Sequence, residues 1–267
     1  MSKIVIPNTN IKISKFIYGT GTFNANRIKK RISLLKEAVD NGFTHFDTSP
    51  LYNFGLSEKD LGIILKQNHY LSVTTKVGLY PPGALNPGFV NIFFRKIAGK
   101  IYPQLSKAIV NFNLEKAKKS LEESMRRLNR DHIDILMVHE PYPGVLNTEE
   151  WYRWLEHLMN KGTVGSCGIA VTSAENIKKI IENDNKNIFK IIQTSDSLSS
   201  HGPDIITTEN SLFRITFGYF SDLKKKQIKF NSAEIIKKIL ERNLKGATII
   251  HTQNKKRLKE FYKLARF

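Results

Sequence analysis

The strongest constraint on the fold is an alternation of short apolar runs with amphipathic segments that continues along almost the whole chain. The apolar runs have the length of buried strands, and the segments between them repeat apolar residues at helical spacing. Strands are predicted at Phe16–Gly19, Thr44–Asp47, Leu71–Thr75, Ile133–Val138, Val164–Ile169, Phe189–Gln193, Leu212–Phe217 and Ala247–Ile250. Helices are predicted at Ile28–Asn41, Glu58–Gln67, Leu114–Asn129, Thr148–Lys161, Ser173–Asn183, Ser232–Asn243 and Lys255–Leu264, with a weak one near Asp204–Asn210. Strands and helices that alternate eight times favour a closed α/β (β/α)8 TIM barrel over an open doubly wound sheet.

Two segments extend this pattern. At the N-terminus, Ile4–Ile6 and Ile11–Ile13 flank a turn-rich triplet, so residues 1–15 are predicted to form a short β-hairpin. After the third strand, residues 79–113 form an enlarged loop on the side of the barrel where active sites lie. Within it, residues 87–102 have the pattern of a short amphipathic helix, which could be a lid, a substrate-recognition element or a membrane or protein docking helix. No linker-like tract interrupts residues 1–267, which we interpret as a single domain.

The composition of the chain restricts the partners that it can bind and the cellular compartment in which it is expected. The chain has 42 Lys and Arg against 24 Asp and Glu, a net charge of +18. The lysines are spread along predicted helices and form no long block, so we interpret the charge as a solvated surface and expect no nucleic-acid partner. A single cysteine excludes an internal disulfide and fits a reducing compartment. No apolar run reaches the ~18 residues of a spanning helix, so a cytoplasmic location is expected; the oligomeric state is left open.

Four polar residues fall at or just after predicted strand ends. Asp47, Lys76 and His139 end the second, third and fourth strands, and Tyr52 follows Asp47 by five positions. Neighbouring strand ends of a barrel converge on one mouth, so these side chains can share a pocket. An ammonium beside a phenol stabilises the phenolate, and a carboxylate can hold that ammonium. This combination suits proton donation to a carbonyl that receives hydride from a nicotinamide.

At these positions the sequence also resembles the aldo-keto reductase family, in the form of its short bacterial members. The segments that carry the resemblance are Asp47–Tyr52 with its continuation to Gly62, Thr74–Gly78, Leu121–Ser124 with Asp134–His139, Gly162–Ile169 and Ile191–Gln193. They occur in the family's order and spacing over nearly the whole chain. The resemblance implies a barrel enzyme that binds a nicotinamide cofactor without a Rossmann glycine motif.

The resemblance also implies roles for the four strand-end residues. Tyr52 would be the general acid in reduction and the base in oxidation, and Lys76 would lower its pKa. Asp47 would pair with Lys76, and His139 would orient the carbonyl. The implied activity is an NADPH-dependent oxidoreductase that reduces an aldehyde, ketone or sugar-like substrate to an alcohol.

The family's cofactor positions map onto Gly19, Thr20, Gly21, Gln193, Thr252, Arg257 and Glu260. Gln193 would bind the carboxamide, Thr252 and Arg257 the adenosine 2′-phosphate, and Glu260 the adenine. A guanidinium and a hydroxyl beside a helix N-terminus also suit a phosphate on physical grounds, so NADPH is favoured over NADH. No metal-ligand spacing or phosphate-binding glycine loop occurs in the sequence.

The sequence departs from the family at three places that concern the cofactor. Ala170-Val171 stands where a hydroxyl residue is common, Thr194–Leu198 lacks the aromatic residue that often stacks on the nicotinamide, and His251 replaces the usual Lys or Gly. These departures leave open an alternative function, a nicotinamide-binding sensor or accessory protein with little turnover. The substrate and the physiological direction do not follow from the sequence.

Overall fold

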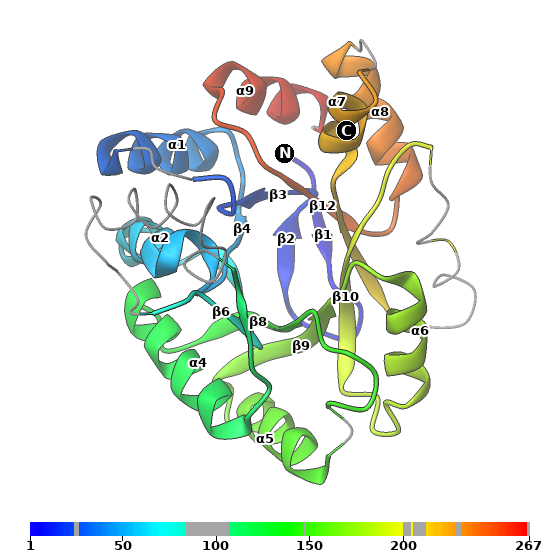
Figure 1. Ribbon diagram of the computed structural model, residues 1–267. Helices are drawn as coiled ribbons and strands as arrows, with labels where there is room; N and C mark the ends of the chain where they lie inside the picture. The colour runs from blue at the N-terminus through cyan, green and yellow to red at the C-terminus, as the bar shows by residue number, and fades with distance from the viewer. Residues whose placement is uncertain are drawn as a thin grey trace.

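In the computed structural model, eight parallel strands close into a barrel surrounded by helices (Figure 1). The structure describes residues 1–23, 27–83, 107–146, 148–199, 204, 212–227 and 231–265. Around the barrel, the strands are β3 (Phe16–Gly19), β4 (His45–Asp47), β5 (Ser72–Val77), β8 (Ile133–His139), β9 (Val164–Ala170), β10 (Phe189–Ser195), β11 (Phe213–Phe217) and β12 (Ala247–Ile250), and β12 pairs with β3. The predicted single-domain TIM barrel is confirmed, and every strand boundary lies within two residues of its predicted position.

The helices follow the strands in the predicted order. They are α1 (Ile28–Asp40), α2 (Leu56–Gln67), α4 (Leu114–Leu128), α5 (Glu149–Asn160), α6 (Ala174–Glu182), α7 (Tyr219–Lys225), α8 (Ser232–Arg242) and α9 (Lys255–Leu264). Side chains of Asn113, Thr148 and Ser173 cap the first turns of α4, α5 and α6. The sequence did not predict α7, a seven-residue helix without a capping side chain. The helix predicted near Asp204–Asn210 lies outside the described residues, apart from Asp204 itself.

Side chains of the barrel strands alternate between two apolar layers. On β8, Ile135 and Met137 point into the barrel, whereas Leu136 and Val138 pack outward beneath the helices. The predicted N-terminal hairpin is present as β1 (Lys3–Val5) and β2 (Lys12–Ser14), which pair antiparallel. Figure 1 shows this hairpin across the centre of the barrel, and two of its isoleucines, Ile13 within β2 and Ile6 just after β1, join the inner layer. The inner apolar layer therefore ends at a hairpin on one side and leaves the carboxyl ends of the strands for polar residues.

The segment after β5 is only partly described. It begins and ends with a two-stranded antiparallel sheet, β6 (Leu79–Tyr80) and β7 (Ile109–Val110), beside the barrel mouth. The amphipathic stretch predicted at residues 87–102 lies outside the described residues. Among the helices that the structure does describe, none combines the length and apolar character needed to cross a bilayer.

Candidate active site

The strand register brings the predicted polar residues into the barrel. Asp47 of β4 pairs with Thr74 of β5, and Lys76 of β5 pairs with Met137 of β8. Met137 belongs to the inner layer, so Lys76, its register partner, faces inward above it. His139, two residues beyond Met137 on the same strand, faces the same way. Parallel register thus brings three strand ends together at one mouth.

Lys76 is the centre of the polar group. Its side chain is fully buried, and Nζ donates to Asp47 Oδ1 at 2.6 Å, to the Thr48 carbonyl at 2.9 Å and to the Tyr52 hydroxyl at 3.2 Å. Burial acts to lower the pKa of Lys76, but the charges and hydrogen bonds of Asp47 and Tyr52 outweigh it and raise the pKa above the usual value. Lys76 is therefore a buried, permanently charged ammonium held against the tyrosine.

Tyr52 begins a short 3₁₀ turn, η1 (Tyr52–Gly55), in the loop that follows β4. Burial raises the pKa of its phenol, and Lys76 opposes that rise without reversing it. The sequence led us to expect a depressed tyrosine pKa, and the structure gives the opposite direction because desolvation is the larger effect. The hydroxyl therefore stays protonated at neutral pH, with Lys76 placed to stabilise the phenolate once the proton leaves.

His139 faces Tyr52 across the mouth. The two rings are nearly perpendicular, and their centroids lie 6.2 Å apart. Burial and the nearby Lys76 charge lower the pKa of His139 to about 3, so the imidazole is neutral at physiological pH. Its Nδ1 is buried and makes no hydrogen bond to any described residue.

Tyr52 and His139 line a small cavity with Glu140, Ala170, Gln193, Phe217 and His251. Gln193 is buried on β10, and its Oε1 makes no hydrogen bond to the described residues. Ala170, the register partner of both His139 and Gln193, offers no side-chain donor to that oxygen. The cavity therefore presents an unpaired amide oxygen beside the phenol and the imidazole.

The predicted glycine segment at the end of β3 lies against two of the residues that line this cavity. A Cβ atom at Gly19 would overlap the ring of His251, and one at Gly21 would lie 3.5 Å from the Tyr52 ring. His251 Nδ1 is 3.2 Å from the Gly19 carbonyl oxygen. Thr20 is buried, and its hydroxyl bonds to the Asp47 carbonyl and to Thr48. The backbone of this segment lies beside Tyr52 and His251, which line the cavity, whereas the Thr20 hydroxyl is already used within the protein.

A second cavity adjoins the first at His251. The residues that line it are Phe220, Ser221, Lys224, Ile250, His251, Thr252, Arg257 and Phe261. Thr252 and Arg257 were predicted to meet a phosphate, and Lys224 of α7 adds a second cation. Glu260 is exposed on α9 and lines neither cavity. The two cavities place a basic pocket next to the cavity that Tyr52 and His139 line, with His251 common to both.

A family model described as Aldo/keto reductase family matches residues 15–202. The chain belongs to the aldo/keto reductase family. Among solved structures, an aldo-keto reductase from Bacillus halodurans superposes with a TM-score of 0.76 at 17% identity, covering 100% of this chain and 91% of that one. A glycerol dehydrogenase from Gluconobacter oxydans gives a TM-score of 0.72 at 18% identity, covering 98% and 89%. These likenesses confirm the aldo/keto reductase barrel.

Curated aldo/keto reductase relatives are named for different activities. L-galactose dehydrogenase of Arabidopsis thaliana is 30% identical over 183 residues, which are 63% of this chain and 49% of the relative. NADH-specific methylglyoxal reductase of Escherichia coli is 28% identical over 195 residues, 68% of this chain and 56% of the relative. The chain spans about half the length of the curated relatives that it matches. The substrates in their names differ, and a cofactor is named for the methylglyoxal reductase alone, so family membership leaves both undetermined for this member.

In this aldo/keto reductase, the structure adds site residues that the sequence did not single out. Glu140 and Phe217 line the first cavity, and Lys224 lines the second. Glu140 directly follows His139 at the end of β8, so its position in the chain was the available signal. Lys224 lies on α7, which was itself missed, and Phe217 was assigned only to a strand.

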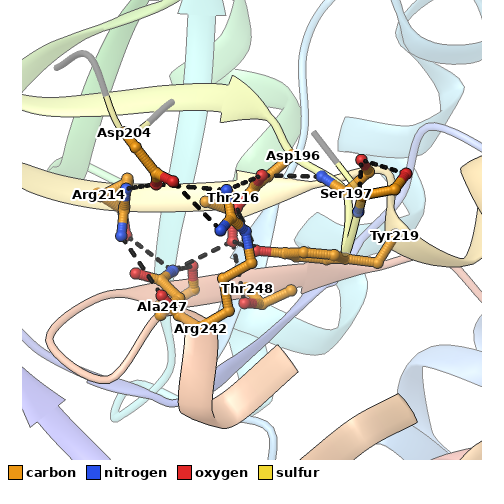
Figure 2. Close-up of polar contacts among 11 residues, drawn as sticks. Asp196, Ser197, Asp204, Arg214, Thr216, Tyr219, Arg242, Ala247 and Thr248 are labelled. Carbon is orange, nitrogen blue, oxygen red and sulfur yellow. Dashed lines mark hydrogen bonds and ion pairs between the residues drawn. The ribbon is translucent and has the colours of Figure 1, made fainter. Parts of the chain in front are cut away.

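An ionic cluster around the fully buried Asp196 holds the end of β10 in this aldo/keto reductase (Figure 2). Asp196 Oδ2 accepts from Arg242 Nε at 2.8 Å and from the Tyr219 hydroxyl at 2.7 Å, and Oδ1 accepts from Arg242 Nη2 at 2.9 Å. Arg242 also reaches Asp204, which pairs with Arg214. The Asp196 backbone N–H donates to the Phe217 carbonyl at 2.8 Å. The cluster therefore ties α8 to the strand ends that carry Gln193 and Phe217.

Proposed function

We propose that this protein is an NADPH-dependent oxidoreductase that reduces a small aldehyde, ketone or sugar-like carbonyl to an alcohol. The observation that supports this most directly is the chain of contacts Asp47–Lys76–Tyr52, which ends at a phenol in a cavity shared with His139. A protonated phenol with an ammonium at 3.2 Å is a proton donor whose conjugate base is stabilised in advance.

In the proposed mechanism, a carbonyl oxygen lies between Tyr52 and His139. The Tyr52 hydroxyl donates its proton to that oxygen as negative charge develops on it. Lys76 stabilises the phenolate that forms, and Asp47 keeps the ammonium in place. The neutral imidazole of His139 hydrogen-bonds to the substrate oxygen and fixes its direction. In oxidation, the same phenolate takes the proton back.

The residues present fit a nicotinamide cofactor. Bound NADPH would supply the hydride. The Oε1 atom of Gln193 is a buried acceptor without a donor among the described residues. The amide N–H of a carboxamide would supply that donor. In the second cavity, Arg257 and Lys224 supply positive charge, and Thr252 lies just before the N-terminus of α9. A guanidinium and an ammonium in one small cavity suit a phosphate monoester, which supports NADPH over NADH.

The names of two relatives point to small polar carbonyl substrates. One is a dehydrogenase of L-galactose and the other a reductase of methylglyoxal. The methylglyoxal reductase is named as NADH-specific, so the preference for NADPH rests on the cavity beside Arg257 and not on the family.

The direct test is consumption of NADPH against a panel of aldehydes, ketones and aldoses. Turnover of several small carbonyl compounds is expected. Submicromolar NADPH binding without turnover on a broad panel would instead favour the alternative function, a nicotinamide-binding sensor or accessory protein.

The choice of cofactor is expected to depend on Arg257. Replacing it by leucine removes a charge-assisted phosphate contact, so the KM for NADPH should rise by about tenfold or more while the KM for NADH stays nearly unchanged. Steady-state kinetics with both cofactors measure the difference. Lys259→Leu, on the same helix but outside the cavity, is the matched control. Equal losses with NADPH and NADH would contradict the assignment of Arg257 to the 2′-phosphate.

The rate of reduction is expected to be nearly independent of pH between about pH 6 and pH 9. Burial raises the pKa of Tyr52, so the acid remains protonated over this range. The pKa of His139 is lowered to about 3, so the imidazole remains neutral. The profile of kcat/KM against pH should therefore lack the inflection near 6.5 that an ordinary histidine gives. A loss of activity centred near that pH, abolished in His139→Asn, would contradict the neutral imidazole.

A further inference from the structure

Glu140 is held at the mouth of the first cavity in a backbone conformation that non-glycine residues rarely adopt. Its φ is 50°, in the left-handed region. The backbone N–H donates to the Ala170 carbonyl at 2.7 Å, and Oε2 accepts from the Thr172 backbone N–H at 3.2 Å and from its hydroxyl at 3.3 Å. Non-glycine residues held in this way concentrate at functional sites, where surrounding contacts maintain the strained geometry. The contacts with Ala170 and Thr172 keep Glu140 in the cavity wall.

Seven residues line this cavity, and among them Glu140 is the one that carries a formal charge. The others are aromatic, aliphatic, amide or imidazole side chains. His139 is neutral because burial and Lys76 lower its pKa to about 3. The His251 ring packs over Gly19, partly withdrawn from water, which also lowers its pKa and favours the neutral form. Lys76 lies behind Tyr52 and is neutralised by Asp47. A substrate in the cavity therefore meets one uncompensated negative charge.

We propose that Glu140 selects the substrate by charge, so that the site takes neutral, hydroxylated carbonyl compounds and rejects carbonyl compounds that carry a carboxylate next to the reacting group. This inference rests on the proposed function, because it concerns the substrate of that same cavity. Glu140 acts as a specificity-determining residue that contacts the substrate and takes no part in proton transfer.

Two physical effects give this selection. A substrate carboxylate would lie within a few ångströms of Glu140 in a partly desolvated site, where repulsion between like charges is strong. A substrate hydroxyl would instead donate to Oε1, which makes no hydrogen bond to a described residue. The +18 charge of the chain attracts anions at long range, so a local carboxylate is needed to discriminate between a cofactor phosphate and an anionic substrate. The phosphate would meet Arg257 and Lys224 in the neighbouring cavity, whereas the substrate group next to the carbonyl would meet Glu140.

The test uses glycolaldehyde and glyoxylate, which differ by a hydroxymethyl group and a carboxylate beside the same aldehyde. We expect Glu140→Gln to shift the ratio of kcat/KM values toward glyoxylate by at least about tenfold relative to wild type, because it removes the charge that repels the carboxylate. Glu140→Gly removes the same charge and suits a φ of 50°, so it provides a second variant that folds without strain. Glu150→Gln, on the exposed start of α5, is the matched control and should leave the ratio unchanged.

The outcomes separate this inference from the proposed function. Turnover of glycolaldehyde with an unchanged ratio in both Glu140 variants would overturn charge selection and leave the proposed function standing. If neither aldehyde is turned over, charge selection is decided by binding, and the proposed function is decided by the wider carbonyl panel. In that case an NMR titration with glyoxylate, followed on the Gln193 side-chain amide, should show at least about tenfold tighter binding to Glu140→Gln than to wild type. Equal binding to the two proteins would overturn the inference.

Discussion

Replacing Tyr52 by phenylalanine is expected to lower kcat for carbonyl reduction by a factor of about 10² to 10⁴. The substitution removes the proposed acid and leaves the ring, so the cavity keeps its shape. The hydrogen bond from Lys76 to the hydroxyl is 3.2 Å long, and its loss should change the free energy of unfolding by about 1 kcal/mol. Lys76 keeps its partners Asp47 and Thr48, so the buried ammonium is not left unpaired. Stopped-flow measurement of NADPH oxidation under single-turnover conditions isolates the chemical step.

The control for this substitution is Tyr70→Phe, because Tyr70 is 65% exposed and far from the proposed chemistry. NADPH binding to both variants, measured by cofactor fluorescence, should match wild type. A Tyr52→Phe enzyme that binds NADPH normally and keeps wild-type rates would remove Tyr52 from the mechanism.

The barrel could be predicted because its elements are set by local patterns. The strand β3 and the helix α9 were placed at their observed bounds, since apolar runs and helical spacing mark such elements directly. The helix α7 was missed because seven residues beginning after Gly218, at a φ of 106° and without a capping side chain, carry little local signal. The pairing of β6 with β7 joins residues about thirty positions apart, and nothing in the two short strands specifies it.

The candidate site was predictable where it follows from topology and not where it depends on side-chain environment. Strand ends of a parallel barrel meet, so the proximity of Asp47, Lys76 and His139 followed from their positions. The direction of the Tyr52 pKa did not follow, because it is a balance of burial against charge that exists only in the folded protein. Glu140 gave no sequence signal beyond its place after His139.

The ionic cluster around Asp196 also could not be predicted from the sequence, and it is expected to contribute to the stability of the folded protein. Its members come from the end of β10, from α7 and from α8, and no local pattern joins them (Figure 2). The side chain of Asp196 is fully buried, whereas that of Arg242 is 16% exposed. Asp196 thus depends on Arg242 and Tyr219 for the hydrogen bonds that its carboxylate would otherwise make with water.

Asp196→Asn is therefore expected to lower the free energy of unfolding by about 3 kcal/mol, because it leaves the partly buried guanidinium of Arg242 facing a neutral amide. For a chain of this size, such a loss lowers Tm by roughly 6–12 °C, measured by thermal unfolding followed by circular dichroism. The control is Asp222→Asn, whose partner Lys226 is well exposed, so its effect should stay below about 1 kcal/mol. If both variants unfold at the wild-type temperature, the cluster does not stabilise the folded state. If only Asp196→Asn is destabilised, and NADPH binding weakens with it, the cluster also holds the strand ends that carry Gln193 and Phe217 in the geometry that the cofactor needs.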